Sequence, residues 1–149
     1  MTEPRLRDRL IDGLYVDAML LADEARSYFD ELGRDEQADL DPLLRVGFAC
    51  ESLKVTTRLM HVIAWILARR AVAGGELDEA DVLSPSRRLG NAPESDPAIL
   101  AALPERARDL IHASTILHRR VAQLEAALAA PPAEESPARA MQRRLHLHL

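Results

Sequence analysis

The sequence predicts an all-α protein, and three observations lead to this fold class. Ala, Leu, Arg and Glu, which favour helices, dominate the 149 residues. Aromatic residues make up only 3% of the chain, whereas β-sandwiches and barrels rely on aromatic and β-branched residues. Three long segments repeat apolar residues at spacings of three and four, which is the spacing of one helix face. We therefore expect one domain, an antiparallel three-helix bundle over residues 12–128.

The first predicted helix covers residues 12–32, after an N-terminal arm of residues 1–11. One of its faces is apolar and the other is acidic, as in a helix that packs on a core. Gly33 follows the last apolar residue and is expected to end the helix. The apolar face is formed by Leu14, Ala18, Leu21, Ala25, Tyr28 and Leu32.

The second predicted helix begins after the capping pair Asp41-Pro42, runs to Ala73 and ends at Gly74-Gly75. Its two lines of apolar residues merge into an arc of about 220°. Two neighbouring helices should cover a narrower stripe, so we expect either the long loop or a second subunit to pack here as well. We predict a homodimer whose interface uses part of this arc, formed by Phe48, Val55, Leu59 and Val62.

The third predicted helix runs from Pro104 to Leu128 and has the narrow apolar face of a coiled-coil helix. A loop over residues 74–103 connects it to the second helix. Loops of this length are uncommon inside compact domains and are usually functional or disordered. Residues 129–149 contain several Pro and Glu residues and predict a flexible C-terminal tail.

Charge and hydropathy exclude two classes of partner. The net charge is −5, so the chain lacks the basic footprint that nucleic-acid binding usually needs. The longest strongly apolar stretch, residues 60–73, contains His61, Arg69 and Arg70 and is too short and too charged to span a bilayer. The charged N-terminal residues do not form a signal peptide. We expect a cytoplasmic protein that binds neither nucleic acid nor membrane.

No motif for catalysis, metal binding or a cofactor emerges. Gly74-Gly75 follows a helix, the reverse of the order that a phosphate-binding loop requires. His112 and His118 are six residues apart, on different faces of a helix, so a shared metal ion is not expected. Cys50 lies on an apolar line and is interpreted as a small buried hydrophobic residue. We therefore predict no catalytic residue, no metal and no cofactor, and a protein that is not an enzyme.

One polar stripe on the second helix has two interpretations. It contains the only Trp of the chain, and Trp and Arg dominate the hot spots of protein interfaces, which favours a partner-binding surface. Alternatively, the Trp packs against the third helix or the loop and belongs to the core. The stripe recurs at spacings of three and four and comprises Glu51, Lys54, Arg58, His61 and Trp65.

The same helix resembles the signature segment of the RcdA family, alphaproteobacterial regulators of the degradation of CtrA. The family pattern is E-S-x-x-x-T-T-R-L-M, then an apolar run containing Trp, then R-A-V-x-x-G-E. Residues 103–111, Leu-Pro-Glu-Arg-Ala-Arg-Asp-Leu-Ile, give a second and weaker match, and the resemblance covers residues 43–128. The matching positions of the first motif are Glu51, Ser52, Thr56, Thr57, Arg58, Leu59, Met60, Trp65, Arg70, Ala71, Val72, Gly75 and Glu76.

The resemblance implies a self-associating three-helix bundle with a mobile tail and no catalysis. RcdA-like proteins act as adaptors that feed cargo proteins to the protease ClpXP during the cell cycle, together with a response-regulator-like priming factor, CpdR. The leading hypothesis is therefore a non-enzymatic adaptor in regulated proteolysis that tethers cargo to primed ClpXP. Two alternatives are a helical oligomerising scaffold without a proteolytic role, placed at the cell pole, and an accessory subunit of an enzyme.

Overall fold

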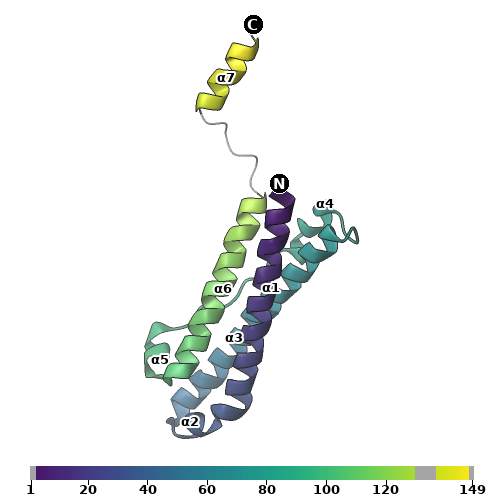
Figure 1. Ribbon diagram of the computed structural model, residues 1–149. Helices are drawn as coiled ribbons and strands as arrows, with labels where there is room; N and C mark the ends of the chain where they lie inside the picture. Colours follow the sequence, from purple (N-terminus) through teal and green to yellow (C-terminus); the bar gives the residue numbers. More distant parts are fainter. Residues whose placement is uncertain (1–2, 130–136, 148–149) are drawn as a thin grey trace.

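A computed structural model describes residues 3–129 and 137–147 of the chain, and this part is all-α, without a β-strand (Figure 1). The predicted fold class is therefore confirmed. In chain order the elements are α1 (Glu3–Ser27), a π-helical turn η1 (Tyr28–Leu32), α2 (Arg34–Ala38), α3 (Pro42–Ala73), α4 (Glu79–Val82), a 3-10 turn η2 (Pro85–Arg87), α5 (Pro97–Ala102), α6 (Glu105–Ala129) and α7 (Pro137–Leu147).

The ends of α3 lie where local sequence signals place them. Asp41 precedes the helix in an extended conformation, and its Oδ1 accepts a hydrogen bond of 2.9 Å from the Leu44 backbone nitrogen. Pro42 occupies the first turn, where its missing N–H group is not needed. At the other end the Gly74 nitrogen donates to the Arg70 carbonyl, and Gly75 has a φ of 78°, which closes the helix.

The long helices α1, α3 and α6 lie side by side, but they are not all antiparallel (Figure 1). Arg58 of α3 contacts Ser114 of α6, and Trp65, one heptad later, contacts Glu125. Residue numbers therefore rise together along the two helices, which means that α6 runs parallel to α3. The expectation of an antiparallel bundle is wrong for this pair. The reason is the connection between α4 and α5, which returns along the bundle before α6 begins.

The core of the bundle contains the four residues that the sequence analysis assigned to a dimer interface. Phe48, Val55, Leu59 and Val62 are all buried within the single chain. The Tyr28, Phe29 and Phe48 rings pack together nearby, with ring centroids 5.1–6.1 Å apart. This interface assignment is therefore wrong, because α1 and α6 already cover that side of the arc.

The opposite side of the apolar arc is left open. Five large apolar side chains of α3 are exposed, and they recur at spacings of three and seven, as the a and d positions of a coiled coil do. Cys50 lies in the same line and is exposed rather than buried, because this face turns away from α1 and α6. We call this line the α3 seam; its large members are Leu43, Val46, Leu53, Met60 and Leu67.

Two terminal segments differ from expectation. The predicted N-terminal arm is helical from Glu3 onward, because Ile11 is buried and anchors the early turns of α1. Residues 137–147 of the predicted tail form α7, in which Pro137 takes the first position and strong helix formers follow. Residues 130–136, which were also assigned to the tail, lie outside the described residues.

Candidate functional site

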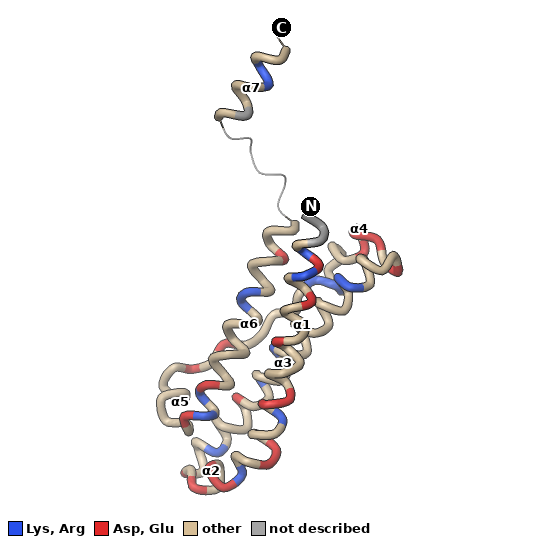
Figure 2. Tube along the Cα trace, viewed as in Figure 1, with Lys and Arg blue, Asp and Glu red and all other residues tan. Residues whose placement is uncertain are grey.

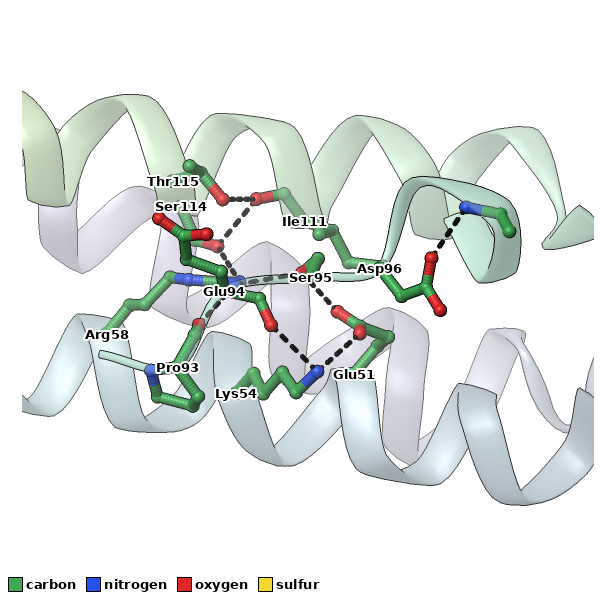
Figure 3. Close-up of polar contacts among 11 residues, drawn as sticks. Glu51, Lys54, Arg58, Pro93, Glu94, Ser95, Asp96, Ile111, Ser114 and Thr115 are labelled. Atoms are coloured by element: carbon green, nitrogen blue, oxygen red, sulfur yellow. Dashed lines mark hydrogen bonds and ion pairs between the residues drawn. The ribbon is translucent and has the colours of Figure 1, made fainter. Parts of the chain in front are cut away.

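An extended segment, residues 89–96, lies in the groove between α3 and α6 and is held there by polar contacts (Figure 3). We call it the strap. It runs from Leu89, beside the C-terminal half of α6, down to Ser95, beside the first half of α3. Because backbone in this conformation has no helical partners for its own N–H and C=O groups, side chains of α3 and α6 supply them.

Arg58 is the centre of this arrangement. Its side chain is only 2% exposed. Nη2 donates to the Pro93 carbonyl at 3.0 Å and to Ser95 Oγ at 2.9 Å, while Nη1 donates to Ser114 Oγ at 3.3 Å. Burial lowers the pKa of Arg58, and the negative charge of Glu51 acts in the opposite direction. One guanidinium thus joins α3, the strap and α6.

Glu51 supplies the negative charge of the network. Its side chain is 1% exposed, and its two carboxylate oxygens have separate partners. Lys54 Nζ donates to Oε1 at 2.9 Å, and Ser95 Oγ donates to Oε2. Lys54 also donates to the Glu94 carbonyl at 3.0 Å. Since buried charges are tolerated only when they are paired and hydrogen-bonded, these contacts account for the burial of Glu51 and Arg58.

Each of the two serines in the network accepts one hydrogen bond and donates another. Ser95 Oγ accepts from Arg58 and donates to Glu51. Ser114 Oγ accepts from Arg58 and donates to the Ile111 carbonyl at 2.8 Å. A hydroxyl can do both at once, so neither serine leaves a buried group unpaired. The sequence analysis missed both residues; a serine within the apolar face of α6 was the available signal for Ser114.

The upper part of the strap is anchored by α6. Glu125 Oε2 accepts from the Leu89 nitrogen at 2.7 Å and from Trp65 Nε1 at 2.9 Å. His118 Nε2 donates to the Gly90 carbonyl at 2.8 Å. Arg69 lies over the Trp65 ring, with its Cζ 5.3 Å from the ring centroid. These contacts hold the indole between two helices and the strap.

The structure places most of the polar stripe beneath the strap. Trp65 is 3% exposed and packs against the third long helix and the loop, as the core interpretation predicted. Glu51 and Arg58 are also buried, and Lys54 and His61 are partly buried, because the strap covers the stripe. Partner binding by Glu51, Lys54, Arg58, His61 and Trp65 stays a prediction, and for the buried Glu51 and Arg58 it would require the strap to move away.

The polar groups of the site bind one another and hold the strap against α3 and α6. Its carboxylate is paired with a lysine, and the hydroxyls of Ser95 and Ser114 are engaged with Arg58. Within residues 3–129 and 137–147, no group of three or more His, Cys, Asp or Glu side chains is arranged to hold a metal ion. None of the helices described for this chain combines the length and the apolar character that a membrane crossing requires.

The fold and the strap define a small all-α protein built on three long helices. A model of the family described as "Protein of unknown function (DUF1465)" matches residues 2–148, and the chain belongs to this family. The crystal structure of RcdA from Caulobacter crescentus CB15 is similar, with 29% sequence identity and a TM-score of 0.67. The match covers 85% of this chain and 97% of that chain. The resemblance to the RcdA family is thereby confirmed. No curated protein matches the sequence.

Proposed function

We propose that this protein is a non-enzymatic adaptor in regulated proteolysis, which tethers cargo proteins to a primed ClpXP protease. The observation that supports the proposal is the likeness to RcdA across nearly the whole length of that protein. The structure of the site agrees with it, since the buried charges are used to fix the strap rather than to perform chemistry. An adaptor accelerates degradation by raising the effective concentration of cargo at the protease.

The proposed partners are a CpdR-like priming factor, cargo proteins that include cell-cycle regulators, and ClpXP indirectly through the priming factor. The proposed location is the cytoplasm, at the cell pole. Helices α1 and α2 and the turn between them display many acidic residues at the lower end of the bundle (Figure 2). A partner with a basic surface would be attracted to this end.

The α3 seam supports a homodimer as the functional form of the adaptor. Large apolar side chains are exposed along five turns or more of one helix, with Leu53 67% and Met60 64% exposed. Exposed apolar patches of this kind usually mark an interaction site. The coiled-coil spacing fits a second copy of the same helix, whose seam is complementary to itself in a two-fold dimer.

A degradation assay tests the adaptor function. A cargo regulator is incubated with ClpXP and the priming factor, with and without this protein, and the loss of cargo is followed over time. We expect faster degradation only when both the priming factor and this protein are present. A pull-down of ClpXP should show the same dependence on the priming factor.

The alternative function is a helical oligomerising scaffold without a proteolytic role, and the α3 seam is the observation that favours it. In that case the protein self-associates but neither binds primed ClpXP nor changes the degradation rate. Self-association alone therefore does not distinguish the two functions, and the assay with cargo does.

A further inference from the structure

A second polar feature lies on the outer side of the strap, away from the buried network. Small ligands occupy cavities of about 300–1,000 Å³, and a cavity of 420 Å³ opens between α3 and the turn η2. Two arginines stand at its rim, and no acidic residue lines it. The lining consists of His61, Ala64, Trp65, Ala68, Pro85, Ser86, Arg87, Arg88 and Gly90.

The two rim arginines are available to a ligand. The Arg87 side chain makes no hydrogen bond or ion pair within the described part of the chain, and the Arg88 side chain uses only Nε, which donates to the Leu83 carbonyl at 3.1 Å. Both side chains are exposed. A guanidinium with a free edge binds a carboxylate through two parallel hydrogen bonds, which makes an adjacent arginine pair a strong site for an oxyanion.

His61 adds a donor to the same cavity. Its Nδ1 is buried without a hydrogen-bond partner, beneath Gly90. The tautomer that carries the proton on Nε2 leaves no buried N–H group without an acceptor, so Nε2 is the donor that His61 offers. A Cβ atom on residue 90 would lie 2.6 Å from the His61 ring, so glycine is required for the strap to cover this histidine.

The floor of the cavity is apolar. Trp65 contributes part of its indole, and Ala64 and Ala68 are small enough to leave room beside it. A ligand that fits therefore carries a carboxylate next to an apolar group. An extended polyanion such as a nucleic acid fits poorly, because the net charge of the chain is −5 and the basic groups here are few.

We propose that this cavity binds an acidic segment of a partner protein, in which an Asp or Glu carboxylate meets Arg87 and Arg88 and a neighbouring apolar side chain lies against Trp65. That the ligand is a segment of a protein rests on the proposed adaptor function. The rim residues Pro85, Ser86, Arg87 and Arg88 are all exposed, so a chain segment can enter without opening the bundle.

The test uses the full-length protein and its single tryptophan as a fluorescent reporter. The probe is the peptide acetyl-Leu-Asp-Leu-amide, and the matched probe is acetyl-Leu-Asn-Leu-amide. We expect saturable binding of the acidic peptide with a Kd below about 1 mM, and binding of the amide peptide that is about tenfold weaker or more. Succinate supplies the carboxylate without the peptide and should bind more weakly than the acidic peptide.

The variants locate the site. Arg87→Gln with Arg88→Gln should weaken the acidic peptide about tenfold, whereas Arg119→Gln with Arg120→Gln, an exposed arginine pair on α6, should change its Kd by less than about twofold. Arg87→Gln alone removes no side-chain hydrogen bond or ion pair within the described residues and should weaken binding about threefold, so misfolding of the double variant would leave the test intact.

Four outcomes overturn the proposal. The first three are the absence of saturable binding, equal affinity for the Asp and Asn peptides, and equal losses in the two double variants. The fourth is succinate binding as tightly as the peptide, because the site would then serve a small carboxylate rather than a protein. The titration contains no protease, so it can fail while the degradation assay succeeds, and the reverse also holds.

Discussion

The Trp65 indole of α3 donates a 2.9 Å hydrogen bond to the Glu125 carboxylate of α6, and the same oxygen accepts the backbone nitrogen of Leu89. One carboxylate therefore joins the two parallel helices to the start of the strap. Trp65 packs a large apolar surface into the core and satisfies its polar edge at the same time, which a buried tryptophan needs.

Trp65→Ala should destabilise the protein strongly, because it opens a cavity in the core and leaves Glu125 without one of its donors. We expect the free energy of unfolding to fall by about 3–5 kcal/mol. Trp65→Phe keeps much of the packing and should cost less. Chemical denaturation followed by circular dichroism measures both, with His112→Ala on the exposed side of α6 as the control, at under about 0.5 kcal/mol. A loss below about 1 kcal/mol for Trp65→Ala would contradict the core position of the indole.

Glu51→Gln tests the buried network. The substitution keeps the shape of the side chain but removes the negative charge that faces Lys54 and Arg58. Since breaking a buried ion pair leaves the other charge uncompensated, we expect a loss of about 3 kcal/mol in the free energy of unfolding. Glu24→Gln is the matched control, because Glu24 pairs with Arg106 at 3.2 Å on the surface and such pairs contribute under about 1 kcal/mol. Equal losses in the two variants would show that the burial of Glu51 carries no extra cost.

Features set by neighbouring residues were predictable from the sequence, and features set by distant contacts were not. The start of α3 follows from Asp41 and Pro42, and its end from Gly74, because caps depend on a few adjacent residues. The unusual width of the apolar arc was also correctly identified. Which side of the arc remains open, however, depends on where α6 lies. That position depends on the strap, which a periodicity along one helix does not encode.

The polar stripe shows the same limit. Its residues were found by their spacing and by the single tryptophan, and the structure does bring Glu51, Lys54 and Arg58 together. Their partner Ser95 lies 44 residues from Glu51 along the chain, in a segment with weak pattern. Without that partner, a stripe of charged residues is indistinguishable from a solvated face. The strap turns it into a buried network.

Gly90→Ala tests the fit of the strap over His61. The added Cβ would meet ring atoms at 2.6–2.8 Å, so the strap or the ring must shift. We expect a loss of about 1–3 kcal/mol, the usual cost of overpacking. Gly13→Ala provides the opposite control: nothing lies within 4 Å of its added Cβ, and removing a glycine from the interior of α1 should stabilise by about 0.5–1 kcal/mol. Thermal unfolding of both variants shows whether they shift in opposite directions.

Stability should decrease at alkaline pH because of Tyr28. Burial, and then its hydrogen bond to Glu36, raise the pKa of Tyr28 above its usual value of about 10. Above that pH the unfolded chain loses this proton while the folded chain keeps it, so folding loses free energy as the pH rises. The loss from this group is up to about 1.4 kcal/mol per pH unit. Denaturation of the wild type and Tyr28→Phe at pH 9 and pH 11 measures it, and a Phe variant with the same alkaline loss would contradict this origin.

The α3 seam should control self-association. Leu53→Glu combined with Met60→Glu places like charges at the centre of the seam, where a second copy would bring two more of them close. In light scattering at micromolar concentration, we expect the wild type to have the molecular mass of a dimer and the double variant that of a monomer. Both residues are exposed in the single chain, so the free energy of unfolding of the monomer should change by less than about 1 kcal/mol. Leu20→Glu on α1, which is 60% exposed, is the control and should leave the dimer intact. A wild type that remains monomeric over a wide concentration range would refute the dimer. Dissociation by Leu20→Glu as well would instead move the interface to a surface that includes α1.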